Sequence, residues 1–447
     1  MKMPQTPPDW SLLWEGARQR RNAAMIDAES FVASQRYLHW DEMRHRPKEH
    51  GLSYEDAWAV VKVARVLRYQ KIPLKDKTGR PCVFFVSAPM FEKLHRVDQR
   101  AGGTLATQET PEAVTNPETR DQYYVSSLIE ESITSSQLEG AVTTRVVATE
   151  MLRTGRAPRD RSERMILNNY RTMRQLREWK EQDLTPELIL EIHRMISEEA
   201  LDVADGAGRW RRAEEDVRVE NVEGDIVHNP PLARELPERI ADFCTFANER
   251  AIKGYLHPVL RSIMLHYWLA YDHPFVDGNG RTARALFYWS MLRHGYWLME
   301  FISLSSILLK APAKYYRAFL FTETDGNDLN YFLLHQLETL EQAINSLHAW
   351  IGKKAGEQAR IRQEIRSLGL FNHRQATLLQ HARRCPAADY TVTGHMTSHS
   401  ISNETARNDL IHLAKIGLLR QVRRGRVWHF FPAGDLEARI HGLSSTE

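Results

Sequence analysis

The sequence has few cysteines and no long hydrophobic run, and each of these absences excludes a class of protein. Three cysteines occur in 447 residues, and Cys82, Cys244 and Cys385 lie far apart without metal-ligand spacing. This argues against a disulfide framework and favours a reducing compartment. No apolar run approaches membrane-spanning length, and the polar first residues contain no signal-peptide core. We therefore expect a cytoplasmic protein without a membrane partner.

The overall composition says little about binding partners. The formal net charge is +3, and 42% hydrophobic with 26% charged residues is typical of a globular protein in water. A chain of this length holds roughly two to four domains and buries ample core. Function has to be inferred from local motifs.

One stretch, His273-Pro-Phe-Val-Asp-Gly-Asn-Gly-Arg-Thr-Ala-Arg284, carries a base, a metal ligand and two cations. His273 belongs to the residue type that titrates near neutral pH, so it can accept a proton from an attacking hydroxyl. Asp277 can hold Mg²⁺ through one carboxylate while phosphates supply further ligands. The stretch therefore predicts chemistry on a polyphosphate.

The residues after Asp277 predict a phosphate cradle at the start of a helix. Gly278, Asn279 and Gly280 have no apolar side chain, and glycine lets backbone amides turn toward an anion. A phosphate bound there would lie at the positive end of the following helix. Arg281 and Arg284 are three residues apart on that helix, so both can reach one polyphosphate.

The spacing of these residues resembles the Fic family signature H-x-F-x-[DE]-G-N-G-R-x-x-R at every fixed position. An isolated Asp-Gly-Asn-Gly is usually only a turn, but here it follows an apolar run over 259–270 that reads as a buried helix. The resemblance implies a mostly α Fic fold and a nucleotidyltransferase that moves AMP from ATP onto a protein hydroxyl, with Mg²⁺. It implies that His273 is the general base, Phe275 packs the loop and Asp277 holds Mg²⁺. The implied ATP and phosphate contacts are Gly278, Asn279, Gly280, Arg281 and Arg284.

A second motif lies ahead of this core, in a helix predicted from about residue 121 to residue 140. Its apolar face is made of Val125, Leu128, Ile129 and Ile133. A helix ending at Gly140 is the simpler interpretation. The segment Ser135-x-x-x-Glu139-Gly140 also resembles the Fic inhibitory motif [ST]-x-x-x-E-[GN]. That resemblance implies autoinhibition, in which Glu139 pairs with Arg284 and ATP binds in a non-productive pose.

Two further segments resemble parts of Fic proteins. β-Branched residues flank the turn Glu223-Gly-Asp225, which predicts a β-hairpin. In Fic proteins this place holds the flap, which pins the target by strand-like pairing. The corresponding residues are Ile226, Val227 and His228, with an ordinary surface hairpin as the alternative. Tyr315 and Tyr316 resemble the segment that walls the adenine pocket, with core packing as the alternative.

The chain divides into four predicted segments. Residues 1–115 are expected to form a helical N-terminal domain, and a polar linker is expected over 102–119. The Fic domain is expected at 116–345 and a helical connector at 346–365. Residues 366–447 predict two helices and a basic hairpin, which resembles a winged-helix domain. Its candidate DNA contacts are Arg407, Asn408, Arg423, Arg424 and Arg426, although winged helices also dock proteins.

Three functions remain open at this stage. The first is AMP transfer from ATP to a Ser, Thr or Tyr hydroxyl of a target protein or of the chain itself, autoinhibited by Glu139. The second is AMP removal at the same site, alone or in a bifunctional enzyme. The third is a nucleotide-sensing DNA-binding regulator, against which the intact His273 counts. The resemblance also implies a homodimer as one option.

Overall fold

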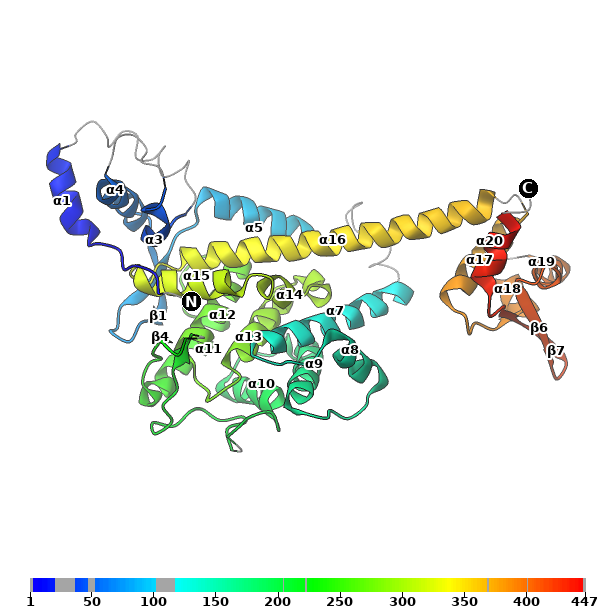
Figure 1. Ribbon diagram of the computed structural model, residues 1–447, viewed down its shortest axis with the longest axis horizontal. Helices are drawn as coiled ribbons and strands as arrows, with labels where there is room; N and C mark the ends of the chain where they lie inside the picture. The colour runs from blue at the N-terminus through cyan, green and yellow to red at the C-terminus, as the bar shows by residue number, and fades with distance from the viewer. Residues whose placement is uncertain are drawn as a thin grey trace. The chain divides into compact units, whose positions relative to one another are not determined.

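The computed structural model describes residues 3–20, 37–46, 53–101, 117–203, 205–221, 223–367, 370–399 and 401–444. The chain is mostly helical, as the sequence predicted (Figure 1). It divides into two compact units, Met1–His348 and Ala349–Glu447. Residues 102–116 of the predicted linker lie outside the described residues. Its last residues, 117–119, are helical instead, since α7 (Pro117–Leu138) begins there. The division falls close to the predicted end of the Fic domain, but the predicted boundary at residue 115 does not separate compact units.

Two buried helices form the centre of the first unit, α12 (Pro258–Asp272) and α13 (Asn279–Arg293). In each of them 13 of 15 residues are buried, so neither helix has a polar face toward water. Helices α9 (Arg161–Trp179) and α10 (Pro186–Ser197) pack against α13, and α11 (Leu236–Ala247) packs against α12. The loop between α12 and α13 is therefore held on a rigid core.

Helix α7 (Pro117–Leu138) lies beside α9 and α13 (Figure 1). Leu128, Ile129 and Ile133 are buried as predicted, but Val125 is 37% exposed, so its assignment to the buried face is wrong. From Leu128 onward other elements cover α7. Glu130 and Gln137 stay partly exposed there, but most of the polar residues are buried. Glu131 is one of them. It accepts hydrogen bonds from Ser303 and from the backbone and side chain of Ser305, at the start of α14 (Ser305–Leu308).

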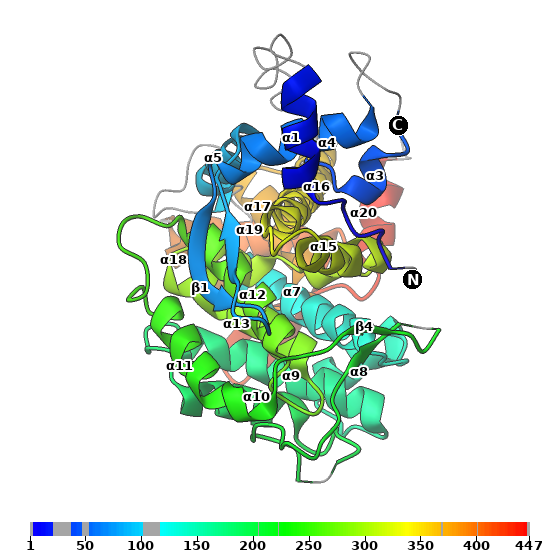
Figure 2. The same cartoon turned by 90° about the vertical axis from the view of Figure 1, so that its left-hand side faces the viewer.

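The N-terminal segment packs onto the same unit. It contains α1 (Trp10–Arg20), α3 (Trp40–Met43), α4 (Tyr54–Val66), β1 (Gln70–Lys75), β2 (Pro81–Phe84) and α5 (Ala88–Ala101). Strand β1 pairs antiparallel with β2 and packs against α11 (Figure 2). Buried Lys62 pairs with Asp325 at 2.9 Å, and Arg65 donates to Tyr331 at 2.7 Å. These long-range polar contacts explain why residues 1–115 do not form a separate compact unit.

The remaining elements of the first unit surround the central helices. They are α8 (Arg145–Thr154), β3 (Val219–Glu220), β4 (Ile226–His228), η1 (Ala233–Glu235), η2 (Trp297–Phe301), α15 (Pro312–Thr324) and α16 (Asn330–Ser367). The division between the two units falls within α16.

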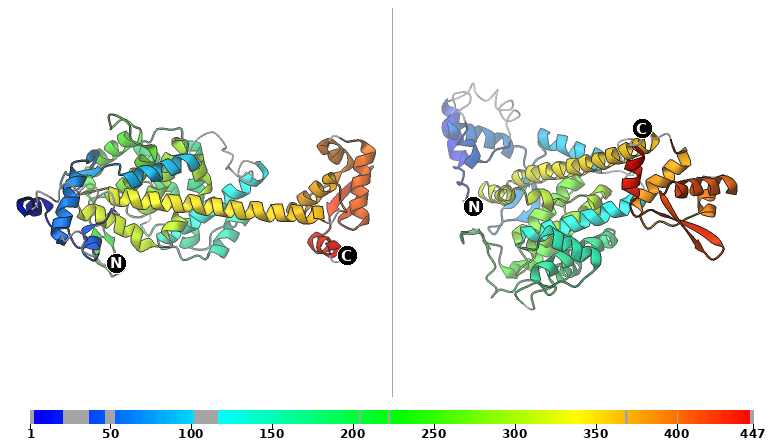
Figure 3. Two further views of the ribbon diagram at one scale, coloured as in Figure 1. Left: turned by 90° about the horizontal axis from the view of Figure 1, so that it is seen from above. Right: turned by 45° about the vertical axis from the view of Figure 1, so that its right-hand side comes forward.

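The second unit combines helices with a three-stranded antiparallel sheet of order β5-β7-β6 (Figure 3). Its elements are α17 (His373–Arg384), β5 (Tyr390–Thr391), α18 (Val392–His399), α19 (Asn403–Lys415), β6 (Leu419–Arg424), β7 (Val427–Pro432) and α20 (Leu436–Ser444). Ser402 caps α19, since its side chain accepts from Thr405 N–H at 3.2 Å. Strand β5 and helix α18 were not among the elements predicted for this unit. No helix among the described residues has the length and apolar composition to cross a membrane.

Candidate active site

His273 ends α12 in a left-handed conformation, with φ 46° and ψ 55°. Its N–H donates to the Leu269 carbonyl at 3.0 Å, and buried Arg211 donates from Nε to the His273 carbonyl at 2.9 Å. Its Nδ1 lies 3.2 Å from the Ala270 carbonyl. Because a carbonyl only accepts, Nδ1 carries the ring proton and Nε2 keeps a free lone pair. The tautomer suits a base that uses Nε2.

The surroundings of His273 keep its imidazole neutral. Burial, together with the nearby positive charge of His228, lowers the pKa of His273 to about 4. We predict that the NMR signal of the His273 ring titrates with a midpoint near pH 4 and stays constant between about pH 8 and pH 6. Since the base is already deprotonated in that range, its protonation should not lower activity there. The His273→Ala variant assigns the signal, and a midpoint near the ordinary value of about 6.5 would contradict the prediction.

Phe275 fixes the loop that follows His273. Its buried ring stacks on His193, with centroids 3.6 Å apart, and on Trp210 at 5.1 Å. Asn279 brackets the same residue, because its Oδ1 accepts from Phe275 N–H at 3.0 Å and its Nδ2 donates to the Phe275 carbonyl at 2.9 Å. The side chain of Asn279 therefore shapes the loop, a contribution that the sequence did not reveal.

His193 of α10 also holds this loop in place. Its Nδ1 accepts from Gly208 N–H at 3.1 Å, so its Nε2 carries the proton and donates to the Asp277 carbonyl at 2.9 Å. Burial lowers the pKa of His193 to about 4, which keeps this single tautomer at neutral pH. His193 was not among the site residues predicted from the sequence.

Replacing Phe275 by alanine is expected to lower the free energy of unfolding by about 3–5 kcal/mol, because a fully buried aromatic ring is lost. Urea unfolding followed by tryptophan fluorescence measures this directly, since Trp210 stacks on the ring. The matched control is Phe91→Ala, because Phe91 is 68% exposed and its loss should change stability by about 0.5 kcal/mol or less. Equal losses from the two variants would show that the stack does not hold the loop.

The two arginines of the signature lie buried in α13 behind Gly278, which has φ 81° at the helix N-cap. Arg281 donates from Nη1 to the Ile196 carbonyl at 3.1 Å, but its Nε and Nη2 have no hydrogen-bond partner. Nη1 of Arg284 is unpartnered in the same way. Burial lowers the pKa of Arg281. Because unpaired buried donors are costly, these N–H groups indicate a place for an anion.

Arg284 is held by the end of α7. It donates from Nε to Ser135 Oγ, from Nη2 to the Ser135 carbonyl and from Nη2 to Glu139 Oε1, each at 2.9 Å. Burial opposes the charge of Arg284, but the facing Glu139 carboxylate raises its pKa overall. Glu139 also presses against Gly280, since a Cβ there would lie 2.2 Å from Glu139 Oε1. The carboxylate thus lies beside the predicted phosphate cradle.

Helix α7 ends in a Schellman motif that orients Glu139. Ala141 N–H bonds to the Ser136 carbonyl at 3.0 Å and Gly140 N–H to the Gln137 carbonyl at 3.1 Å, while Gly140 has φ 90°. The two sequence interpretations of this segment are therefore compatible. The helix ends at a glycine, and Glu139 reaches Arg284 from that end.

One cavity of about 480 Å³ brings several of the predicted residues together, but Asp277, Arg281 and Arg284 are not among its lining residues. Its lining includes Glu139, Val227, His228, His273, Gly280, Tyr315 and Tyr316. Tyr315 is buried and its hydroxyl lies 2.8 Å from His266 Nε2. Tyr316 is 39% exposed and donates to the Leu138 carbonyl at 3.3 Å. Tyr315 therefore packs in the core and also borders the cavity.

The predicted hairpin is present next to this cavity. Strand β3 pairs antiparallel with β4, with Val219 opposite His228 and Glu220 opposite Ile226. Ile226 is 40% exposed, whereas His228 is buried. The Nε2 of His228 donates to the Tyr271 carbonyl at 2.7 Å, and its Nδ1 faces Glu323 at 2.8 Å.

His228 anchors the hairpin to the core through Tyr271 and Glu323. Burial opposes its charge, but Glu323 raises the pKa of His228 overall. A protonated ring satisfies both its carbonyl and its carboxylate partner.

Asp277 has the chemistry of a magnesium ligand. Its side chain is 40% exposed, and its Oδ1 accepts from Gly278 N–H at 2.5 Å. Among the described residues, no cluster of three or more His, Cys, Asp or Glu side chains forms a complete metal site. One carboxylate supplemented by nucleotide phosphates is a usual magnesium environment, so the site fits a cation that enters with ATP.

The candidate DNA contacts lie on the surface of the second unit. Arg407 and Asn408 are exposed on α19, and the exposed β6–β7 hairpin carries Arg423, Arg424 and Arg426. Arg423 stacks on Trp428 at 5.8 Å and Arg424 on Phe431 at 5.0 Å. These contacts orient two of the arginines along the hairpin.

Residues 183–291 match the Fic/DOC family, so the chain contains a Fic domain. It is 34% identical over 117 residues to a protein adenylyltransferase Fic of Nematostella vectensis, over 26% of this chain and 25% of that protein. It is 36% identical over 114 residues to a protein adenylyltransferase Fic of Drosophila erecta, over 26% of this chain and 21% of that protein. The match thus spans a quarter or less of the length of these relatives. A Fic family protein from Desulfovibrio desulfuricans G20 has a TM-score of 0.49 at 18% identity, covering 77% of this chain and 94% of that one.

Proposed function

We propose that this chain is a protein adenylyltransferase, which moves AMP from ATP onto a Ser, Thr or Tyr hydroxyl of a target protein or of itself. The main support is that neutral His273, with a free Nε2, lines the same cavity as Gly280 at the N-terminus of α13. Buried N–H groups of Arg281 and Arg284 without partners lie in the same helix. The domain's similarity to adenylyltransferases of other organisms points the same way.

The reaction follows from the roles of these groups. His273 Nε2 takes the proton of the target hydroxyl while the oxygen attacks the α-phosphorus of ATP. The bond from the α-phosphorus to the bridging oxygen breaks, and pyrophosphate leaves with that electron pair. The amides of Gly278, Asn279 and Gly280 and the guanidinium groups stabilise the charge on the phosphates. Asp277 would hold Mg²⁺, which when bound neutralises phosphate charge.

We further propose that Glu139 inhibits this transfer. Its contact with Arg284 occupies a donor that the terminal phosphate of ATP would otherwise take, and its carboxylate lies against Gly280. ATP bound beside this carboxylate would not present its α-phosphorus to His273. Release of Glu139 is therefore the activating step.

AMP removal is a second candidate at the same site. Glu139 and His273 line one cavity, so the carboxylate could place a water for attack on the α-phosphorus of a modified side chain. A nucleotide-sensing regulator that binds DNA through the exposed arginines of a winged-helix second unit is the candidate of another class.

The unpaired thiols of Cys82, Cys244 and Cys385 are consistent with the expected cytoplasmic location.

Intact-mass spectrometry after incubation with Mg-ATP separates these functions. Wild type, Glu139→Gly and His273→Ala are compared, alone and with a cell lysate as target source. An adduct of the mass of AMP on Glu139→Gly, small on wild type and absent from His273→Ala, supports transfer and inhibition together. Loss of AMP from a pre-modified protein, without any forward reaction, would favour AMP removal. Neither reaction in any variant would favour the regulator.

A further inference from the structure

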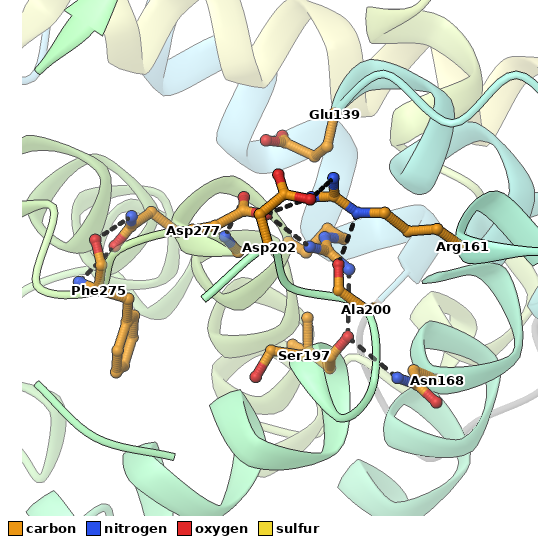
Figure 4. Close-up of polar contacts among 12 residues, drawn as sticks. Glu139, Arg161, Asn168, Ser197, Ala200, Asp202, Phe275 and Asp277 are labelled. Carbon is orange, nitrogen blue, oxygen red and sulfur yellow. Dashed lines mark hydrogen bonds and ion pairs between the residues drawn. The ribbon is translucent and has the colours of Figure 1, made fainter. Parts of the chain in front are cut away.

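Arg161, the first residue of α9, reaches Asp277 from outside the Fic signature. Its Nη2 lies 3.3 Å from Asp277 Oδ2. Two other acceptors hold the same guanidinium, since Nε donates to the Ala200 carbonyl at 2.8 Å and Nη1 to Asp202 Oδ1 at 2.6 Å. Figure 4 shows the Arg161 side chain directed at both carboxylates, with Glu139 nearby. The guanidinium is therefore placed by the fold rather than by a single surface ion pair.

The two oxygens of Asp277 have different surroundings. Oδ1 accepts the Gly278 N–H at 2.5 Å, which commits it to the loop. Oδ2 faces Nη2 of Arg161 at 3.3 Å and Nη2 of Arg281 at 3.9 Å. Oδ2 is thus the oxygen left for a cation, and Arg161 approaches that same atom.

We propose that Arg161 competes with the divalent cation for Oδ2 of Asp277 and so sets the cation affinity of the nucleotide site. This inference rests on the proposed function, because the cation enters with ATP. When a cation takes Oδ2, Arg161 keeps its contacts with Ala200 and Asp202. Its charge therefore remains close and repels the cation, so removal of that charge strengthens cation binding.

The competing role for Arg161 is a direct contact with a phosphate. A phosphate ligand would increase the affinity for the nucleotide even without metal, so its removal would weaken nucleotide binding. The contacts favour competition, because all three nitrogens of Arg161 already have oxygen acceptors. By contrast, Arg281 and Arg284 each keep buried N–H groups without a partner.

The test measures Mn²⁺ binding by electron paramagnetic resonance on the full chain with saturating α,β-methylene-ATP, which is not cleaved. Arg161→Gln is expected to bind Mn²⁺ about two- to fivefold more tightly than wild type, the range for loss of an exposed ion pair. Arg161→Lys keeps the charge and should stay near wild type. The matched control is Arg164→Gln on the same helix, because Arg164 pairs at 2.8 Å with Glu199, and it should leave Mn²⁺ affinity unchanged.

Each other outcome has a distinct meaning. Unchanged or weaker Mn²⁺ binding by Arg161→Gln, with unchanged circular dichroism, would overturn the inference. Weaker binding of the analogue by Arg161→Gln without Mn²⁺ would also overturn it, in favour of a phosphate ligand. If Asp277→Asn binds Mn²⁺ as wild type does, the magnesium site of the proposed function fails, and the inference with it. Absence of AMP transfer leaves the binding result intact, so the two failures are distinguishable.

Discussion

Replacing His273 by alanine in the Glu139→Gly background is expected to lower the rate of AMP transfer by about 10²–10⁴-fold, the usual contribution of a general base. The reason is geometric as well as chemical. Nδ1–H is committed to the Ala270 carbonyl, and Nε2 is the free nitrogen of a ring that lines the cavity. Initial rates of AMP incorporation, followed by intact mass at several ATP concentrations, measure the loss. It should appear in kcat, with KM for ATP nearly unchanged, because His273 is not placed on the phosphates.

The control is His45→Ala, since His45 is an exposed histidine outside the signature. It should transfer AMP at the rate of its parent. If the His273→Ala variant kept more than about a tenth of the parent rate, a loss below the usual range for a base, another group would have to take the proton.

Replacing Glu139 by glycine is expected to raise the rate of AMP transfer by about 10- to 100-fold. A charge-assisted hydrogen bond contributes about 1.5–3 kcal/mol, and every 1.4 kcal/mol corresponds to about a factor of ten. Here the bond joins Glu139 Oε1 to Arg284 Nη2 at 2.9 Å, and the guanidinium is 2% exposed. The measurement is the initial transfer rate of both proteins at the same ATP concentration.

A second pair of variants distinguishes the effect of the Glu139 charge from the effect of its size. Glu139→Gln keeps the size of the side chain and should release the inhibition only in part, because a neutral amide bonds less strongly to a guanidinium. The matched control is Glu130→Gln, which removes a carboxylate of the same helix that pairs with Arg145 at 2.6 Å. It should leave the rate unchanged. A Glu139→Gly variant no faster than wild type would rule out inhibition by Glu139.

The helices and the hairpin around the site could be predicted because each is encoded by a short stretch of neighbouring residues. The apolar run before His273 and the glycines after Asp277 indicated a helix, a turn and a second helix, and α12 and α13 follow that order. The turn at Gly224 indicated the hairpin of β3 and β4. Each of these signals depends on neighbouring residues, so it can be read without the tertiary structure.

Contacts between distant segments could not be predicted from the same patterns. Arg161 and Asp277 lie 116 positions apart, and Arg211 and His273 lie 62 apart, so no periodicity links them. Lys62 and Arg65 fall on a helix that looks amphipathic, yet both are buried against acidic and tyrosine side chains. Val125 shows the converse error, because it was assigned to a buried face and is exposed. The helical period identifies which residues share a face, but it does not show where along the helix other elements begin to cover that face.

Gly140 contributes its left-handed backbone conformation to the proposed inhibitory motif, and no side chain. A side chain at this position would meet nothing within 4 Å, so space does not require a glycine. The left-handed backbone does, and asparagine is among the other residues that adopt it most readily. This matches the two alternatives, G and N, at the end of the motif. The proposed inhibition by Glu139 can therefore be tuned by changing how easily the chain turns at Gly140, a residue that does not line the cavity.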